Sequence, residues 1–433
     1  MNAPLIIDNG SDTTKCGYAG DNHPRSIFPT LVGYGRGRSI MGDVNLPPDY
    51  VPEYYIGEEA MSLRGILRFD FPVESGLVTE WRSMEKIWFY IFYNDLRVNP
   101  VDHPVLLTEP PLNPALNRER MAEFFFETLN VPAMAVLSSA SLALQFLEKT
   151  TGLIVDMGGD ATHIVPIYDN SVISHAISRI GIAGQDITKY LLRLLRQRGY
   201  ILNSGAERRM VREAKERFCY VALDPEEQMR FIERTIESES LFYLPDGGIA
   251  FGVGSIEKFC APEILFNPAA LGLSEYPLHE GIYRSIQNCE PNIQPELYQN
   301  IILTGGSSLF FGLKERLHKE LTKLVPETTK IQIFAPPQRE LAAWLGGSML
   351  ASQPFFSKFW VWREDYQKYG SVIARPGVLS KFHPLGQNLK PHLVRLRQQE
   401  SCPFCGILGI LVGQEKETGK RILFCLTCKN KIL

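Results

Sequence analysis

Two stretches of the sequence carry the same arrangement of residues, and this repeat limits the possible folds more than any other feature. Residues 5–14 read LIIDNGSDTT and residues 153–162 read LIVDMGGDAT, so Asp, Gly, Asp and Thr recur at the same offsets. In each case an apolar strand meets a turn built on Asp and Gly, and a second strand follows over 15–19 or 163–168. This is the pattern of a β-hairpin. The repeat therefore predicts two lobes related by duplication.

The rest of the chain alternates strands with helices. Buried strands are predicted over 104–109 and 301–304, where runs of apolar residues end at Pro or Gly. The spacing of apolar residues predicts helices over 81–94, 117–129, 186–197, 206–222 and 313–324. Strands that alternate with helices are typical of an α/β architecture.

Length and composition agree with a globular protein of several folding units. The chain has 433 residues, of which 45% are hydrophobic and 21% charged, and domains average roughly 150 residues. No apolar stretch approaches the roughly 18 residues of a membrane-spanning helix, and residues 1–10 lack the features of a secretory signal. We therefore expect an intracellular protein without membrane insertion. The formal net charge of −3 does not indicate nucleic-acid binding.

The turns of the two predicted hairpins suit a polyphosphate. Each offers backbone donors at its tip, and each places one carboxylate, Asp8 or Asp156, where it could approach a metal ion. A third glycine turn, Gly305-Gly306, joins a strand to a helix, which lets a ligand approach the backbone. The alternative is that both segments are ordinary hairpins with Asp-Gly turns and bind no ligand. The same residues occur at the same positions in both hairpins, and this favours the phosphate site.

The last residues form a separate unit by composition. Residues 376–400 are predicted to be a linker, and residues 401–433 carry two Cys-x-x-Cys pairs. Strand-like segments over 407–412 and 421–424, joined by a turn over 415–420, would place four thiolates around one zinc ion, as in a zinc ribbon. The predicted ligands are Cys402, Cys405, Cys425 and Cys428. Iron in the same geometry is the main alternative, and disulfides are disfavoured in a reducing compartment.

Several motifs give the chain a resemblance to a known family. They include DNGS at 8–11, GDNHPR at 20–25, MEKIW at 84–88, HPVLLTE at 103–109, CYVALD at 219–224, LPDG at 244–247, TGG at 304–306 and WLGGS at 344–348. Over roughly residues 4–375 the chain resembles actin and the actin-related proteins. The zinc-ribbon-like tail is additional to that pattern.

The resemblance implies the two-lobed fold shared by actin, heat-shock chaperones and sugar kinases, with duplicated ribonuclease-H-like lobes. The outer lobe would comprise about 1–147 and 345–375 and the inner lobe about 148–344, with ATP or ADP and Mg or Ca between them. By position, Asp8 and Asp156 would flank the metal through water. The implied nucleotide-binding residues are Ser11, Lys15 and Gly158 at the phosphates, Gly184 and Asp186 at the ribose, Lys215 and Glu216 at the ribose and base, and Gly305 and Gly306 at the adenosine.

The chain departs from the family at positions that matter for hydrolysis. Ser139 matches the glutamine that positions the attacking water, and Gly159-Asp160 inverts the family's Asp-Gly. Asp12 replaces a glycine beside the phosphates, and Glu340 replaces a lysine beside the adenine. Two unit charges about 4 Å apart repel by roughly 4 kcal/mol at an effective dielectric of 20, so Asp12 needs a compensating charge. We expect nucleotide binding to persist and ATP hydrolysis to be weak or absent.

The contacts that build actin filaments are also altered. Residues 37–55 do not resemble the family's loop that enters the next subunit. Gln145, Glu148 and Gln353 replace apolar or small residues of the receiving groove, and Ser171 stands where an aromatic residue would pack. Burying such groups without partners costs roughly 1–3 kcal/mol each. Self-assembly in the manner of actin is therefore not expected, unless loop and groove have changed together.

These observations predict an actin-related protein that holds an adenine nucleotide as a mainly structural ligand. It would serve as a non-polymerising subunit of a larger assembly, with other protein subunits as partners and actin or other actin-related proteins among the candidates. A polymerising actin-like ATPase of the cytoskeleton is the alternative, and a sugar kinase or chaperone on the same fold is disfavoured. The expected location is the cytoplasm and cytoskeleton, with the nucleus as the alternative.

Overall fold

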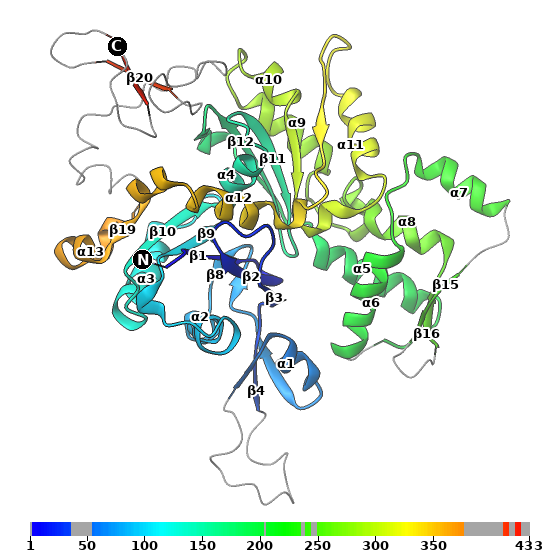
Figure 1. The fold of residues 1–433 in the computed structure, drawn as a ribbon. Coiled ribbons are helices and arrows are strands. Elements are labelled where there is room, and N and C mark those ends of the chain that lie inside the picture. Colours follow the sequence, from blue (N-terminus) through cyan, green and yellow to red (C-terminus); the bar gives the residue numbers. More distant parts are fainter. Residues whose placement is uncertain are drawn as a thin grey trace, which may run out of the picture.

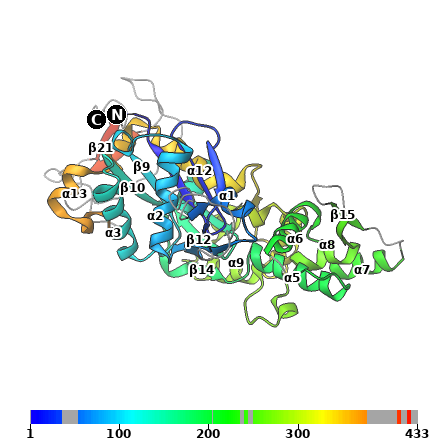
Figure 2. The same cartoon turned by 90° about the horizontal axis from the view of Figure 1, so that it is seen from below.

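Two mixed β-sheets with helices around them form the body of the protein (Figure 1). The structure is a computed structural model, and it describes residues 2–35, 54–202, 205–234, 239–243, 249–375, 410–414 and 421–425. Seen from below, α5 to α8 lie at one end of the molecule and α2, α3 and α13 at the other (Figure 2). In the described part of the chain, no helix is both long and apolar enough to cross a membrane.

The first sheet holds the first of the two repeated hairpins. Its strand order is β19-β10-β9-β1-β2-β3. Strand β1 pairs antiparallel with β2, with Asp8 opposite Lys15, and parallel with β9. The strands are β1 Leu5–Asn9, β2 Thr13–Tyr18, β3 Ser26–Pro29, β9 Val105–Glu109, β10 Ala133–Ser138 and β19 Val361–Trp362.

The second sheet repeats this arrangement. Its order is β13-β12-β11-β17-β18, and β14 pairs with β12. Strand β11 pairs antiparallel with β12, with Asp156 opposite His163, and parallel with β17. The strands are β11 Gly152–Met157, β12 Thr162–Tyr168, β13 Ser171–Val172, β14 Ser178–Ile180, β17 Ile301–Thr304 and β18 Ile333–Phe334. The predicted hairpins are confirmed, and each lies beside one parallel strand in its own sheet, as a duplication requires.

A pair of helices lies between the two sheets. Helix α4 (Ser139–Phe146) packs its buried Ala140, Ala143 and Leu144 against the second sheet, whereas α12 (Ala342–Ala351) packs Trp344 and Leu345 against the first. Figure 1 shows the pair crossing the middle of the molecule. The first residues of α4 and the segment just before α12 both reach the space between the sheets, so this pair carries side chains into the site described below.

The predicted helices are present with small shifts at their ends. The helix predicted over 206–222 is α6, and it ends at Phe218 because the backbone N–H groups of Tyr220 and Val221 donate to Lys258 and Phe311 instead of continuing the helix. The helices are α1 Gly57–Ser62, α2 Trp81–Tyr90, α3 Ala115–Glu123, α5 Gly184–Gln197, α6 Gly205–Phe218, α7 Pro225–Glu233, α8 Ser255–Glu263, α9 Leu278–Gln287, α10 Gln294–Tyr298, α11 Leu313–Thr322 and α13 Arg363–Tyr369.

Short strands and hairpins complete the described chain. They are β4 Val32–Gly35, β5 Tyr54–Ile56, β6 Leu67–Asp70, β7 Val73–Glu74, β8 Leu77–Val78, β15 Ser240–Tyr243 and β16 Ile249–Val253. In the tail, β20 (Ile410–Gln414) pairs antiparallel with β21 (Arg421–Cys425), close to the two predicted strands. Cys402, Cys405 and Cys428 lie outside the described residues, as does most of the loop predicted to be altered, residues 37–55.

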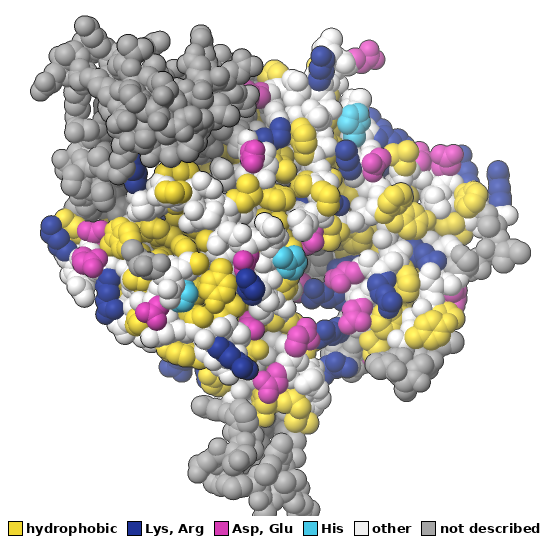
Figure 3. All heavy atoms as spheres, in the orientation of Figure 1, with side chains coloured by type: hydrophobic (Ala, Val, Ile, Leu, Met, Phe, Trp, Pro, Cys, Tyr) yellow, Lys and Arg dark blue, Asp and Glu magenta, His cyan; other side chains and the backbone are white. Residues whose placement is uncertain are grey.

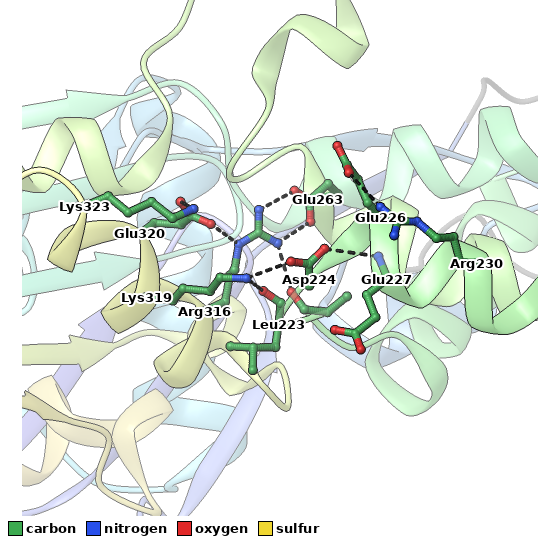
Figure 4. Close-up of polar contacts among 11 residues, drawn as sticks. Leu223, Asp224, Glu226, Glu227, Arg230, Glu263, Arg316, Lys319, Glu320 and Lys323 are labelled. Atoms are coloured by element: carbon green, nitrogen blue, oxygen red, sulfur yellow. Dashed lines mark hydrogen bonds and ion pairs between the residues drawn. The ribbon is translucent and has the colours of Figure 1, made fainter.

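A network of charged side chains holds helix α11 against the end of α8 and against the segment that precedes α7 (Figure 4). Arg316 on α11 is only 7% exposed, and its guanidinium donates to both carboxylate oxygens of Glu263 at 2.8 and 3.0 Å. It also donates to Glu320 and to the carbonyl oxygen of Ala222. Nearby, Lys319 pairs with Asp224, and this contact and the N-cap bond hold the pKa of Asp224 at about 2. The network fixes the position of the chain that follows α6.

Candidate nucleotide cleft

A cavity of about 670 Å³ lies between the two sheets. Figure 3 shows basic and acidic side chains gathered around the opening between α1 and α6. The cavity is large enough for a nucleotide with several phosphates, because small-molecule sites span roughly 300–1,000 Å³. Ten of the residues predicted from the sequence line it: Asp8, Ser11, Lys15, Asp156, Gly158, Gly184, Lys215, Glu216, Gly305 and Gly306.

Asp186 is the predicted nucleotide residue that the structure does not bring into the lining. Its carboxylate accepts a hydrogen bond from the backbone N–H of Ala183 at 3.2 Å, at the start of α5, and one from Lys189 at 3.0 Å. A carboxylate in the first turn of a helix satisfies a free backbone donor and interacts favourably with the helix dipole. Asp186 therefore helps to begin the helix whose first residue, Gly184, lines the cavity.

Lys15 and Asp8 form an ion pair at the floor of the cleft, held by the register of the first hairpin. Lys15 Nζ donates to Asp8 Oδ2 at 2.9 Å, and the other carboxylate oxygen accepts from Thr108 Oγ1 at 2.6 Å. Burial alone would lower the pKa of Lys15, but the charge and hydrogen bond of Asp8 outweigh it and raise that pKa. The ammonium group is therefore charged at neutral pH, and it lies in the cavity lining where a phosphate group could bind.

The carboxylates of the cleft fit a divalent cation. Desolvation raises the pKa of Asp156 to about 6, and the negative charge of Asp8 adds to this effect, against the opposing influence of Lys15. Such a pair of carboxylates gains from a cation, and oxygen donors are the ligands that Mg²⁺ and Ca²⁺ prefer. Among the described residues, no three His, Cys, Asp or Glu side chains meet as direct metal ligands.

The Gly305-Gly306 turn can only be built from glycine at its first position. Gly305 has a φ of +81°, and a Cβ there would lie 2.4 Å from the carbonyl oxygen of Met157 and 2.7 Å from Asp156 Oδ1. The turn therefore packs directly on the strand end that carries Asp156. At Gly306, a Cβ would have no neighbouring atom within 4 Å, so the backbone of this residue faces open space in the cleft.

Asp12 has the compensating charge that its position requires. Its carboxylate receives both terminal nitrogens of Arg212 on α6, at 2.5 and 2.6 Å, and Arg212 also donates to Glu216 at 2.9 Å. The Asp12 side chain occupies the volume beside Gly159: a Cβ on Gly159 would lie only 2.8 Å from Asp12 Cβ. A side chain at position 159 would therefore collide with Asp12 unless one of the two segments moved.

The turn between β7 and β8 joins the two phosphate loops. The backbone N–H of Ser75 donates to Asp160 at 2.6 Å, and the N–H of Gly76 donates to Ser11 Oγ at 2.9 Å. Arg179 on β14 donates to the hydroxyl of Ser75 at 2.5 Å. The carboxylate displaced to position 160 therefore binds this turn, which belongs to the other half of the structure.

A second contact crosses the mouth of the cleft. Arg209, one helical turn before Arg212, pairs with Glu58 on α1 at 3.2 Å and with Glu213 on its own helix at 3.1 Å. These groups are partly exposed, and such pairs contribute at most about 1 kcal/mol each. Together with Asp12–Arg212 and Ser75–Asp160, they connect the elements on either side of the cavity.

Several cleft residues were missed by the sequence analysis. Arg212 and Arg339 lie on elements far from the loops that they contact, and no spacing rule predicts such pairs. His163, opposite Asp156, could have been found from the hairpin register. Burial and the charge of Arg179 lower its pKa to about 4, so its imidazole is neutral at neutral pH. Ser139 is the first residue of α4 and lies in the cavity lining.

The comparison with known families agrees with this geometry. A family model described as Actin matches residues 1–377, which include both sheets, the helix pair between them and every residue of the cleft. The match covers more than half of the chain and ends before the described strands of the tail. The chain therefore belongs to the actin family.

Proposed function

We propose that the protein binds an adenine nucleotide with a divalent cation as a mainly structural ligand and acts as a non-polymerising subunit of a larger assembly. The observation that carries the proposal is the cleft itself. Lys15 and the glycine turns are arranged for phosphates, and Asp12–Arg212, Ser75–Asp160 and Glu58–Arg209 connect the elements around it. A nucleotide in this position would add contacts to both sides of the cavity and so stabilise the folded chain.

The cation would be held by Asp8 and Asp156 through its bound water molecules. When bound, it would neutralise phosphate charge and orient the phosphate chain. Lys15 would contact the same phosphates from the first hairpin, and Ser11 and Gly158 would offer hydrogen-bond donors from the two turns.

The polarity of the surface supports the proposal that this subunit does not form filaments as actin does. Three of the altered groove residues, Glu148, Ser171 and Gln353, are exposed, and Gln145 is half-buried. A polar surface of this kind binds a neighbouring apolar loop poorly, because burying each group without a partner is unfavourable. Partners would be protein subunits of the parent assembly, including actin or another actin-related protein, in the cytoplasm or cytoskeleton.

The nucleotide content of the purified protein provides the first test of this proposal. Denaturing the purified full-length protein and separating the supernatant by chromatography should release close to one adenine nucleotide per chain. Lys15→Met should retain at least about tenfold less, because loss of a hydrogen bond to a charged group costs roughly 1.5–3 kcal/mol. Lys358→Met, at an exposed site outside the cleft, is the matched control and should retain its nucleotide. A stably folded wild-type protein that carries no nucleotide would contradict the proposal.

We further propose that the tail binds one zinc ion through Cys402, Cys405, Cys425 and Cys428. The Cys-x-x-Cys spacing and the β20–β21 hairpin between the two pairs support this assignment. Elemental analysis of protein purified without chelator should find about one zinc per chain. Cys405→Ser should remove it and leave the nucleotide content unchanged, since the actin-family region has its own core. Iron in place of zinc, or less than half an equivalent of zinc, would disprove the assignment.

A further inference from the structure

A groove of about 430 Å³ is lined by the last strand of the second sheet. Strand β18 pairs with β17 on one side, and within the described chain no strand pairs with it on the other. The groove shares no lining residue with the nucleotide cleft, so it is a second, separate concave site. Its lining consists of Leu147, Lys314, His318 and residues 331–336.

The groove has two walls, which belong to opposite faces of the sheet. Ile333 packs into the core that includes Leu317 of α11, whereas Phe334 packs against the core beside α4. Leu147 follows α4 directly, so it lines the groove from one face of the sheet, and α11 lines it from the other. The groove therefore runs along the free edge of β18. Walls of this kind admit a single extended chain and keep out the edge of another sheet.

The backbone of β18 presents hydrogen-bonding groups to the groove. The N–H of Ile301 on β17 donates to the carbonyl oxygen of Gln332 at 3.1 Å, so Gln332 directs its backbone toward β17. Neighbouring residues of a strand direct their backbone groups to opposite sides, and those of Ile333 and Ala335 therefore face the groove. Pro336 has no N–H group and ends this edge. Such an edge binds an extended peptide through main-chain hydrogen bonds.

The charges around the groove favour an acidic ligand. Lys314 and His318 lie one turn apart on α11, both are exposed, and no carboxylate is among the lining residues. In the described part of the chain, neither side chain takes part in an ion pair, whereas Lys319 on the other side of the helix belongs to the network in Figure 4. On the opposite wall, Lys149 Nζ lies 4.2 Å from the centre of the Phe334 ring. Basic groups on both walls attract a negatively charged partner.

We propose that the groove binds an acidic, extended segment of a partner protein, which adds a strand to the sheet at β18. The main chain of this segment forms hydrogen bonds with Ile333 and Ala335. Its alternate apolar side chains cover Leu147 and Phe334, and its acidic side chains approach Lys314. The inference goes beyond the proposed nucleotide binding and does not depend on it, because the two sites share no residues.

A selection of peptides tests this proposal. Random ten-residue peptides displayed on phage are selected for binding to the full-length protein, and the enriched peptides are synthesised. We expect them to carry Asp or Glu, with apolar residues at alternate positions. Lys314→Glu/His318→Glu should weaken their binding at least about fivefold, because each attraction becomes a repulsion. Lys358→Glu reverses an exposed charge outside the groove and is the matched control, which should bind them as the wild type does.

N-methylation of the peptide backbone tests the mode of binding on the wild-type protein, so this measurement requires no variant to fold. Removing N–H groups at alternate positions should weaken binding at least about fivefold, and removing those between them should change it little, since only one side of an added strand faces β18. A selection in which no enriched peptide depends on Lys314 and His318 would overturn the proposal. Peptides that tolerate N-methylation at every position, or at none, would also overturn it, because they would bind through side chains or as a helix. Neither result would affect the proposed nucleotide binding.

Discussion

The Gly346→Ala protein is expected to unfold with a free energy at least about 3 kcal/mol below that of the wild type. A Cβ at position 346 would lie 1.8 Å from the backbone carbonyl oxygen of Leu142, which is far inside any van der Waals contact. The obstructing atom belongs to the backbone of α4 and cannot rotate away. The added methyl group must therefore separate α12 from α4, although Ala is otherwise favoured over Gly in a helix by about 1 kcal/mol.

Gly347→Ala is the matched control in the same helix. Its Cβ would meet side-chain carbons of Ile6 and Leu106 at 3.1 and 3.3 Å, which small rotations can relieve. This variant should stay within about 1 kcal/mol of the wild type, because the gain in helix propensity offsets the crowding. Denaturant unfolding monitored by circular dichroism measures both variants. Equal stability of the two would show that the α4–α12 contact does not limit how closely the sheets approach.

ATP hydrolysis by the wild-type protein should be on the order of 100-fold slower than by an actin that has glutamine at the position of Ser139, because positioning groups of this kind contribute 10²–10⁴-fold. The serine hydroxyl is too short to orient a water molecule beside the terminal phosphate. Ser139→Gln should raise the rate by about tenfold. Recovery should be partial, because Asp160 is bonded to Ser75 and position 159 has no carboxylate.

Phosphate release under conditions that exclude assembly measures this rate. Ser139→Asn carries the same amide on a shorter chain and should remain close to the wild type. With a pKa of about 4, His163 is neutral from pH 6 to 8, so its titration should not change the rate over that interval. Turnover by the wild-type protein at the rate of an actin would contradict the assignment of the nucleotide as a structural ligand.

Local patterns predicted the elements of the fold, and they failed where the structure depends on distant contacts. The two hairpins and the Gly305-Gly306 turn could be found because strand alternation and turn residues are local properties. Most of the ten predicted residues that line the cavity came from the resemblance to actin and not from local pattern. The match to the Actin family then accounts for the arrangement of the two sheets.

The pairing of Asp12 with Arg212 could not be predicted, because 200 residues separate them and each has other possible partners. Asp186 has a role that the family pattern does not indicate. The resemblance implies a ribose contact, which stays a prediction, and the structure shows that the carboxylate also caps the start of α5 by accepting from the backbone N–H of Ala183. The predicted end of α6, at residue 222, was too late. The backbone N–H groups that follow the helix donate to the carbonyl oxygens of Lys258 and Phe311, which are distant in the sequence.

The crowding between Asp12 and Gly159 makes substitutions at these two positions interdependent. A side chain at position 159 would force the two phosphate loops apart, because its Cβ would lie 2.8 Å from Asp12 Cβ. Asp at position 159 is therefore expected to be tolerated only when Asp12 is replaced by a smaller residue, and Arg212 would then keep Glu216 as a partner but lose Asp12. The two positions form an epistatic pair.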